Sequence, residues 1–378
     1  MKIVCDNKIP FLRGVFEPYA EVVYLPGRET TPGVVRDADA VVTRTRTKCD
    51  AALLDGSSVK VIATATIGFD HIDTAWCEAH GILWRNAPGC NSWSVKQYIG
   101  AALCVLARRH GLRLSEMTLG VVGVGNVGSK VAKTAEALGM RVLLCDPPRA
   151  RREGPDGFVG LDELVERSDI VTLHVPLSRE GEDATWHLFD AARLAAMRPD
   201  QILINSSRGP VVDNPALKVA LQAKALRAAV LDVWEGEPEP DPGLMSLLDI
   251  ATPHIAGYSA DGKANGTTMS VRTVASVLGL PLTDWTASGV PAPAQPLAFC
   301  IDAAGKSDAE VLAEAILHTY DVQRDSDALR AAPDQFEKLR GDYPVRREPT
   351  AFSLTLRGGT AAQAETLSRL GFQITINQ

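Results

Sequence analysis

The feature that most restricts the fold of this 378-residue chain is a glycine-rich turn between a strand-like apolar run and a helix-like segment. The predicted strand Leu119–Gly123 continues as Gly123-Val124-Gly125-Asn126-Val127-Gly128, which is the pattern Gly-x-Gly-x-x-Gly. The first glycine allows a tight turn, the second lets the backbone approach a pyrophosphate, and the third lets helix and strand pack closely. The pattern therefore predicts a dinucleotide site whose backbone is supplied by Gly123, Gly125, Asn126, Val127 and Gly128.

An acidic residue after the next predicted strand indicates which dinucleotide binds. Asp146 follows the predicted strand Arg141–Cys145. A carboxylate at this place can accept hydrogen bonds from both ribose hydroxyls and would repel the extra phosphate of NADP. The structural alternative is a glycine-rich turn followed by a helix-capping aspartate. Because strand, helix, strand and acid stand in the expected order, we expect NAD as the cofactor.

Short apolar runs alternate with helix-like stretches over most of the chain, which predicts an α/β fold with parallel sheets covered by helices. Near the N-terminus the predicted strands are Ile3–Cys5, Glu21–Leu25, Ala40–Thr43 and Val59–Ala65. The second series is Leu119–Gly123, Arg141–Cys145, Asp169–Leu173, Gln201–Asn205, Ala228–Leu231 and Ile250–Ala251. Six strands with intervening helices meet the requirement of a dinucleotide-binding domain. A proline-rich linker, 280–296, then leads to a small α/β module.

Composition excludes several classes of protein. With 39 Lys and Arg against 46 Asp and Glu, the net charge of −7 argues against nucleic-acid binding. The longest apolar run, Tyr98 to Ala107, has about half of the ~20 residues that a membrane helix needs, so we expect no membrane partner. The seven scattered cysteines contain no Cys-x-x-Cys pair and fit a reducing cytoplasm. The N-terminus has no secretory signal pattern, and we expect a cytoplasmic protein.

Four polar residues follow three successive predicted strands. Arg208 lies just past Gln201–Asn205. Asp232 and Glu237 follow Ala228–Leu231, and His254 follows Ile250–Ala251. The carboxyl ends of parallel strands meet at one edge of a sheet, so we expect these side chains to converge on a crevice beside the nicotinamide.

These residue types suit hydride transfer from an alcohol carbon. Histidine can take the hydroxyl proton as the hydride leaves, or return it in the reverse direction. A glutamate bonded to the other ring nitrogen would fix the tautomer and raise the basicity of the imidazole. The planar fork of arginine can hold a substrate carboxylate and polarise the forming carbonyl.

The motifs in this order resemble the D-isomer-specific 2-hydroxyacid dehydrogenase superfamily over residues 1–280. They are the glycine pattern with Asp146, Asn205-Ser206-Ser207-Arg208-Gly209, Asp232-Val233-Trp234-Glu235-Gly236-Glu237-Pro238 and Thr252-Pro253-His254-Ile255-Ala256-Gly257. The resemblance implies that Arg208, Glu237 and His254 are catalytic. It also implies cofactor contacts at Val175, Ser206, Ser207, Arg208, Asp232 and Gly257, with Asp232 at the nicotinamide end.

The same resemblance implies three domains. A Rossmann-type NAD-binding domain would comprise residues 93–255. A flavodoxin-like, discontinuous substrate-binding domain would combine 1–92 with 256–280. The last segment, 286–378, would form a small α/β dimerisation domain, and we therefore expect a homodimer.

Further segments resemble the branch of this superfamily that oxidises 4-phospho-D-erythronate in pyridoxal 5′-phosphate biosynthesis. The product of that oxidation is (R)-3-hydroxy-2-oxo-4-phosphooxybutanoate. The resemblance extends over the whole chain and implies substrate contacts at Thr45, Thr66 and Tyr258. The segments that carry it are 63–73, 87–91, 145–149, 255–258, 261–263, 266–268, 320–325 and 336–340.

The residues themselves also point to a phosphorylated 2-hydroxy acid. Arg44, Arg46 and Lys48 alternate just after the predicted strand Ala40–Thr43. In an extended segment the three cations would share one face, because side chains repeat every two residues. A basic face in an acidic protein predicts binding of phosphate and carboxylate, with Arg44 and Arg46 among the ligands. A solvated cationic edge is the alternative.

Some features narrow these expectations, and some alternatives stay open. Val175 stands where a threonine of the family would offer a hydroxyl to the cofactor. His71 and Asp73 lack further ligands at metal spacing, so we expect no metal. One alternative function is another D-2-hydroxyacid dehydrogenase, of the 3-phosphoglycerate or glyoxylate/hydroxypyruvate type. The other is an NAD-sensing corepressor, which would not need an acid–base histidine.

Overall fold

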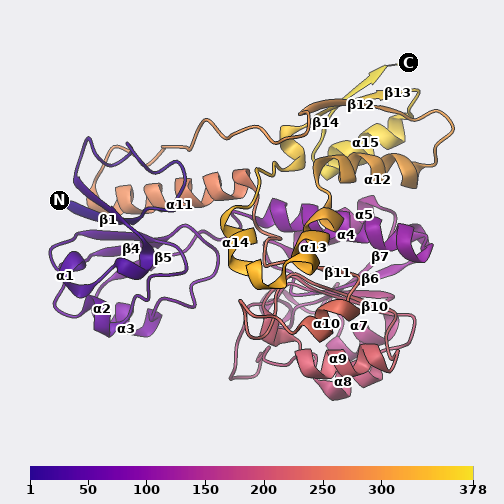
Figure 1. The fold of residues 1–378 in the computed structure, drawn as a ribbon, viewed down its shortest axis with the longest axis horizontal. Helices are drawn as coiled ribbons and strands as arrows, with labels where there is room; N and C mark the ends of the chain where they lie inside the picture. Colours follow the sequence, from indigo (N-terminus) through magenta and orange to yellow (C-terminus); the bar gives the residue numbers. More distant parts are fainter. Residues whose placement is uncertain (378) are drawn as a thin grey trace. The chain divides into compact units, whose positions relative to one another are not determined.

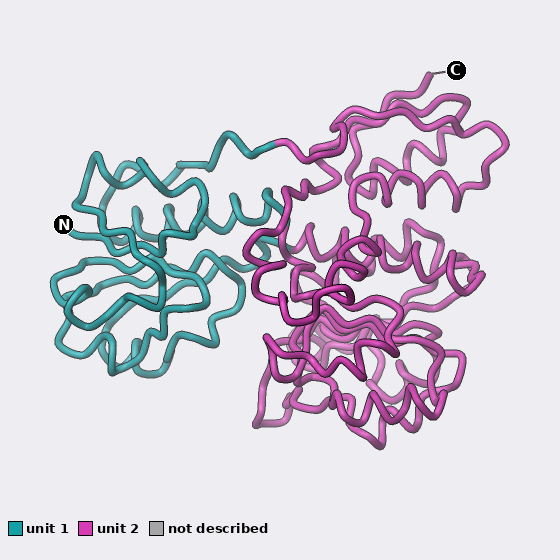
Figure 2. Tube along the Cα trace, in the orientation of Figure 1, with its two compact units in different colours: residues 1–91, 259–291 teal, residues 92–258, 292–378 magenta. Residues whose placement is uncertain are grey.

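The computed structural model describes residues 1–377, which form two compact units (Figure 2). Unit 1 comprises residues 1–91 and 259–291, and unit 2 comprises residues 92–258 and the chain from 292 onward. The chain leaves unit 1 once and returns to it, as expected for a discontinuous domain. The C-terminal module lies in the same unit as the expected NAD-binding domain, and the assignment of three functional domains stays a prediction.

Unit 1 contains a five-stranded parallel sheet in the order β2-β1-β3-β4-β5, which is the flavodoxin-like order (Figure 1). Every residue of β3 and β4 is buried, because helices cover both faces of such a sheet. The strands are β1 (Lys2–Asp6), β2 (Glu21–Leu25), β3 (Ala40–Thr43), β4 (Val61–Thr64) and β5 (Leu83–Arg85). The helices are α1 (Pro32–Val35), α2 (Ala51–Leu54), α3 (Thr74–Ala79) and α11 (Ala260–Leu278).

Unit 2 contains a six-stranded parallel sheet in the order β11-β10-β9-β8-β6-β7 (Figure 1). All six predicted strands are present, and the strand order reverses between β6 and β8. A dinucleotide binds at such a switch point in open parallel sheets, outside the carboxyl ends of the strands. The strands are β6 (Thr118–Val122), β7 (Arg141–Cys145), β8 (Ile170–Leu173), β9 (Ile202–Asn205), β10 (Ala228–Leu231) and β11 (Ile250–Ala251). The helices of this region are α4 (Ser92–His110), α5 (Gly128–Ala137), α6 (Pro147–Glu153), α7 (Leu161–Arg167), α8 (Ala191–Ala196), α9 (Asn214–Gln222) and α10 (Pro242–Leu247).

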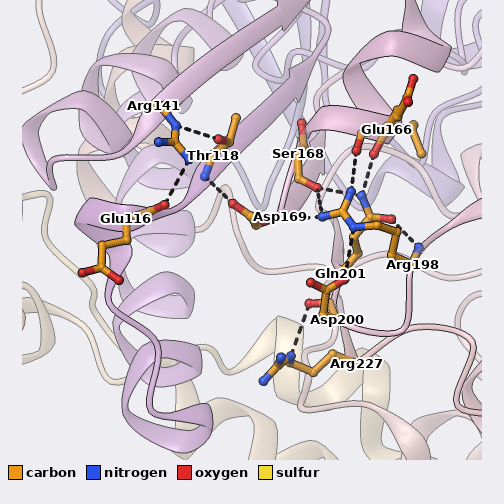
Figure 3. Close-up of polar contacts among 11 residues, drawn as sticks. Glu116, Thr118, Arg141, Glu166, Ser168, Asp169, Arg198, Asp200, Gln201 and Arg227 are labelled. Carbon is orange, nitrogen blue, oxygen red and sulfur yellow. Dashed lines mark hydrogen bonds and ion pairs between the residues drawn. The ribbon is translucent and has the colours of Figure 1, made fainter.

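The amino ends of these strands are tied together by a polar network (Figure 3). The carboxylate of Asp169 accepts a 2.7 Å hydrogen bond from the Thr118 amide at the start of β6. The side-chain amide of Gln201 and the guanidinium of Arg198 both donate to the Ser168 carbonyl, at 2.6 and 3.1 Å. The amino edge of the sheet is thus held by protein–protein hydrogen bonds, and the predicted site residues of unit 2 follow the opposite, carboxyl ends of its strands.

The C-terminal segment adds a three-stranded parallel sheet, and helices of this segment pack on residues 92–258 of unit 2. Helix α12 packs against α4 and α15 against α5, so two helical layers lie between the two sheets (Figure 1). One continuous core joins Leu103 and Val131 of that region to Ile316 and Leu356 of the segment. The elements are β12 (Ala298–Asp302), α12 (Asp308–Thr319), α13 (Val322–Ala331), α14 (Phe336–Gly341), β13 (Ser353–Arg357), α15 (Ala361–Leu370) and β14 (Gln373–Asn377). Deleting the segment would expose this core, so its role has to be tested with point substitutions.

Candidate active site

The glycine-rich turn has the three distinct glycine environments that the pattern predicts. Gly123 has φ +85°, and a Cβ there would lie 2.6 Å from the carbonyl oxygen of His174. A Cβ on Gly128 would lie 1.9 Å from the carbonyl oxygen of Gly123, so this glycine lets α5 start against β6. A Cβ on Gly125 would meet nothing within 4 Å. The middle glycine therefore leaves open space at the helix N-terminus, which fits a pyrophosphate placed close to the backbone.

Asp146 both caps a helix and holds the turn. Its Oδ1 accepts from the amide of Arg149 at 2.9 Å, as the N-cap of α6, and its Oδ2 accepts from the amide of Val124 at 2.8 Å. The Arg149 guanidinium donates to the Val124 carbonyl at 2.8 Å. The capping role considered as the structural alternative is real, and it places the carboxylate beside the glycine turn, where the ribose role was predicted.

The loop after β8 packs directly on the turn. The side chain of Val175 lies 2.8 Å from the position that a Cβ of Gly123 would take. Nε2 of His174 lies 3.0 Å from the Thr172 hydroxyl, and burial lowers the pKa of His174 to about 3. His174 is therefore neutral at physiological pH.

The loop after β9 is shaped by a buried asparagine that the sequence argument left without a role. The side chain of Asn205 accepts from the amide and hydroxyl of Ser207, at 3.0 and 2.8 Å, and donates to the Arg208 carbonyl at 2.9 Å. The Ser206 hydroxyl is buried and has no hydrogen-bond partner within residues 1–377. The loop thus presents Arg208 at the sheet edge and leaves one hydroxyl available for a ligand.

Gly209 brings the Arg208 loop against the loop that carries Glu237. A Cβ on Gly209 would lie only 1.9 Å from the carbonyl oxygen of Trp234. No side chain can enter this contact without moving one of the two backbones. The close packing therefore fixes the position of the arginine loop relative to the glutamate loop.

His254 and Glu237, which were predicted to act as an acid–base pair, lie in contact. Nδ1 of His254 lies 2.7 Å from Oε2 of Glu237, whose Oε1 accepts from the Trp234 amide at 2.9 Å. Burial by itself raises the pKa of the Glu237 carboxyl, but the hydrogen bond and charge of His254, together with the Trp234 amide and the nearby Arg340, lower it overall. Glu237 is therefore an anion whose contact with Nδ1 fixes the imidazole tautomer.

Asp232 lies beneath this pair with its carboxylate turned into the protein. Its Oδ1 accepts from the Ile255 amide at 2.8 Å and from the Thr252 hydroxyl at 2.6 Å. Its Oδ2 accepts from the Ala256 amide at 2.9 Å, and the side chain is almost fully buried. The structure thus gives Asp232 a second task besides the predicted cofactor contact, which is to hold the backbone that follows His254.

Three side chains near this site come from the C-terminal segment, and the sequence argument gave none of them a role. The Arg340 guanidinium lies 5.5 Å from the ring centroid of Tyr258, and Tyr343 contacts the same ring edge-on at 6.0 Å between centroids. Arg346 donates to the backbone carbonyls of Ile255 and Ala256. The one available signal was the 336–340 motif, to which no chemical role had been given.

The predicted substrate cations lie in unit 1 and differ from the expected arrangement. Residues 45–47 follow β3 as bends instead of an extended strand, so the two-residue alternation does not hold over residues 44–48. Arg44 pairs with the buried Asp6 at 3.5 Å, and Lys48 pairs with Asp50 at 2.7 Å. Arg46 is exposed. The prediction of one shared cationic face is therefore wrong for Lys48, which is engaged with a different carboxylate.

The two predicted substrate threonines differ in exposure. Thr45 is exposed, whereas Thr66 is half-buried and donates to the Gly68 carbonyl at 2.9 Å. Both follow the carboxyl ends of neighbouring strands, β3 and β4. They therefore share one edge of the unit 1 sheet with Arg44 and Arg46.

Residues 1–377 contain neither a cluster of metal-binding side chains nor a membrane-spanning helix. No group of three or more His, Cys, Asp or Glu side chains is arranged to hold a metal ion. No helix in this range combines the length and the apolar character that crossing a bilayer requires.

Comparison with known proteins gives consistent matches. The model of the D-isomer specific 2-hydroxyacid dehydrogenase NAD binding domain matches residues 85–256, and a domain of unknown function matches residues 294–371. The chain is 50% identical over 357 residues to an erythronate-4-phosphate dehydrogenase of Bacteroides fragilis, covering 94% of this chain and 99% of that protein. It is 46% identical to the enzyme of the same name from Porphyromonas gingivalis, covering 98% and 100%. Among solved structures, D-lactate dehydrogenase from Aquifex aeolicus complexed with NAD and lactic acid matches 77% of this chain and all of that chain, with a TM-score of 0.63 and 27% identity.

Proposed function

The chain belongs to the erythronate-4-phosphate dehydrogenase family of the D-isomer specific 2-hydroxyacid dehydrogenases, and on that premise we propose how it works. It is an NAD-dependent dehydrogenase, as predicted, and the family confirms the resemblance drawn from the motifs. Its reaction is the oxidation of 4-phospho-D-erythronate at C2 to (R)-3-hydroxy-2-oxo-4-phosphooxybutanoate. This reaction belongs to pyridoxal 5′-phosphate biosynthesis. We prefer it to the two alternatives, which are oxidation of a 3-phosphoglycerate or hydroxypyruvate type of substrate and non-catalytic NAD sensing.

Three features of this chain support binding of NAD at the carboxyl edge of the unit 2 sheet. Gly125 offers open space for the pyrophosphate, Ser206 offers an unpartnered hydroxyl, and Asp146 stands at the ribose position. Asn126, Val127 and Gly128 would supply helix N-terminal amides, and Val175, Ser207 and Gly257 would line the site. When bound, the nicotinamide supplies the hydride acceptor.

His254 is the proposed acid–base group. In the oxidation its Nε2 takes the proton of the C2 hydroxyl, and in the reverse direction it returns that proton. Glu237 keeps the proton on Nδ1 through the 2.7 Å contact and stabilises the imidazolium that forms. The pair is the observation that carries the proposal, because a protein that only binds NAD does not need a half-buried carboxylate on the far ring nitrogen.

Arg208 is the proposed anchor for the substrate carboxylate and C2 oxygen. Its backbone is held by Asn205, and its loop rests on Trp234 through Gly209. A guanidinium can bind a 2-hydroxy acid through two parallel hydrogen bonds, which orients C2 and polarises the forming carbonyl.

NADH formation tests the substrate. The protein would be given 4-phospho-D-erythronate, erythronate and D-3-phosphoglycerate at equal concentrations, with a 2-oxo acid acceptor added in a parallel series in case NADH leaves slowly. Selective oxidation of the 4-phospho acid is expected. Preference for another acid would refute the substrate while keeping the dehydrogenase. His254→Asn serves as the control that removes the proton acceptor.

The phosphate is assigned to unit 1, near Arg44, Arg46, Thr45 and Thr66. The support is that these residues follow adjacent strand ends in an otherwise acidic protein. Arg46→Met should raise KM for the 4-phospho acid at least tenfold with little effect on kcat. Lys48→Met is the matched control, because Lys48 pairs with Asp50, and it should leave KM within about twofold. Equal effects of the two variants would contradict the assignment.

A homodimer formed by the C-terminal sheet is also proposed. The support is an outward sheet face that carries the small side chains Cys300 and Thr355, beside strand edges whose backbone groups are unpaired. Light scattering should give twice the 40.4 kDa chain mass for the wild type and the monomer mass for Thr355→Arg. Val219→Arg, at an exposed position of α9, is the control that should stay dimeric. A dimeric Thr355→Arg variant would count against this face.

The proposed compartment is the cytoplasm. All seven cysteines are free thiols, and six of them are buried. A reducing environment preserves such thiols.

A further inference from the structure

Arg346 belongs to the C-terminal segment, yet its guanidinium is buried against the loop that carries the catalytic histidine. The residue is 3% exposed. Ile255 and Ala256 are the two residues that follow His254. The Nη2 of Arg346 donates to their carbonyl oxygens, at 3.1 and 2.6 Å. It also donates to the Ser94 hydroxyl, which in turn donates to the Ala256 carbonyl at 2.9 Å.

The guanidinium is held in place by aromatic groups of its own segment. It lies 4.3 Å from the ring centroid of Tyr320, and its Nη1 donates to the Tyr343 hydroxyl at 3.4 Å. Both tyrosine hydroxyls donate to the buried carboxylate of Asp325, at 3.0 and 2.6 Å. Burial alone would lower the pKa of Arg346, but the neighbouring tyrosines and carboxylates hold it above its usual value. Arg346 is therefore a fixed cation.

Asp232 holds the backbone of the same two residues from the other side. It accepts the amides of Ile255 and Ala256, whose carbonyls are the acceptors of Arg346. An anion on the N–H groups and a cation on the C=O groups fix both the position and the rotation of these peptides. His254 itself has φ +56°, a left-handed conformation that a non-glycine residue adopts only when its surroundings enforce it.

We propose that Arg346 is a positioning residue for the reaction, which holds the His254–Ala256 backbone so that the imidazole stays aligned with Glu237. The C-terminal segment then completes the active site of its own subunit, a role distinct from subunit association. This inference rests on the proposed function of His254 as the acid–base group. It assigns a task to the segment that a domain of unknown function matches.

The chain offers a matched control for a merely structural arginine. Arg330, on α13 of the same segment, donates to the carbonyls of Met245 and Leu248 at the end of α10, at 2.8 and 2.6 Å. It therefore makes the same kind of contact without touching the His254 loop. Replacing either arginine with methionine keeps a long apolar stem and removes two carbonyl partners.

The test compares Arg346→Met, Arg346→Lys and Arg330→Met as full-length proteins. Displacing a catalytic group by about 1 Å lowers turnover on the order of 100-fold, so we expect kcat of Arg346→Met to fall roughly 10- to 100-fold. NADH affinity and KM should change by less than about threefold, because the hydrogen bonds of Arg346 go to Ser94, Tyr343 and the carbonyls of Ile255 and Ala256. Arg346→Lys keeps a cation that can reach one carbonyl and should recover part of kcat. Arg330→Met should keep the wild-type kcat.

Three measurements make the comparison decisive. Thermal unfolding and light scattering identify variants that have lost stability or association, and kcat is compared only among folded proteins of equal mass. If Arg346→Met does not fold, Arg346→Lys and Ser94→Ala carry the test, with a smaller fall in kcat expected for each. Wild-type kcat in the Arg346 variants, or an equal fall in Arg330→Met, overturns the proposal. Kinetics use whichever 2-hydroxy acid the wild type oxidises, so a wrong substrate assignment and a wrong role for Arg346 give different results.

Discussion

Replacing Gly125 with alanine separates binding of the cofactor from stability of the fold. A Cβ at this position meets no protein atom within 4 Å, and its φ lies outside the left-handed region. The free energy of unfolding without ligand should therefore change by no more than about 0.5 kcal/mol. The new methyl group instead occupies the space into which the pyrophosphate must fit, and such overpacking costs about 1–3 kcal/mol.

The expected loss of NADH affinity determines which assay can detect it. An affinity loss of about 1.4 kcal/mol raises the Kd for NADH roughly tenfold. At an NADH concentration of 100 times the wild-type Kd, ligand stabilisation is about 2.7 kcal/mol for the wild type and about 1.4 kcal/mol for the variant. For a chain of 378 residues the difference corresponds to about 2 °C in Tm. Thermal unfolding with and without NADH measures both quantities in one experiment, and a fluorescence titration gives Kd independently.

The control variant is Gly128→Ala, whose Cβ would lie 1.9 Å from the carbonyl oxygen of Gly123. We expect it to be destabilised by more than about 2 kcal/mol without any ligand, because backbone atoms must move. Two results would refute the reasoning about Gly125. One is wild-type NADH affinity in Gly125→Ala, and the other is a Tm loss without ligand that matches the loss in Gly128→Ala.

Three further predictions follow from the site. Arg208→Lys should lose at least ~1.5 kcal/mol of transition-state stabilisation, about tenfold in kcat/KM, because an ammonium lacks the planar fork; unchanged kcat/KM would exclude the proposed contact. Gly209→Ala should lower both Tm and kcat, since its Cβ would lie 1.9 Å from the Trp234 carbonyl, and a wild-type kcat would mean that the two loops move independently. The Glu237 pKa is lowered in the folded protein, so its contribution to stability is present above the unfolded pKa of about 4.3 and is lost as pH falls through the folded value. Denaturant unfolding of wild type and Glu237→Gln should therefore converge as pH falls from about 6 to 3, and a constant difference would contradict this role.

Much of the fold could be predicted because its signals are local. The ten strands expected in the two large sheets are all present within a few residues of their predicted bounds. Val- and Ile-rich runs bounded by turn residues depend only on neighbours in the chain. The elements that were not predicted are β5, α1, α2, α6, α10, α11, α13 and α14. All of them except the 19-residue helix α11 are short, and the formation of short elements depends on the surfaces they pack against.

The site divides in the same way. Arg208, Glu237 and His254 could be identified because each follows a predicted strand within a recognisable motif. The shared cationic face of Arg44 and Lys48 was not realised, because the expected two-residue alternation needs an extended backbone and the segment bends instead. A periodicity argument holds only where the backbone geometry is already known.

By itself, the sequence determined the parallel α/β architecture, the glycine turn with its acidic partner, and the identities of the proton-transfer and anion-binding groups. Only the tertiary structure decided how those groups are held. The carboxylate of Asp232 accepts from the amides of the two residues after His254. Arg346, about ninety residues further along the chain, donates to the carbonyls of the same two residues. Such contacts join residues far apart in the chain, and they arise from packing in a shared core that no local pattern records.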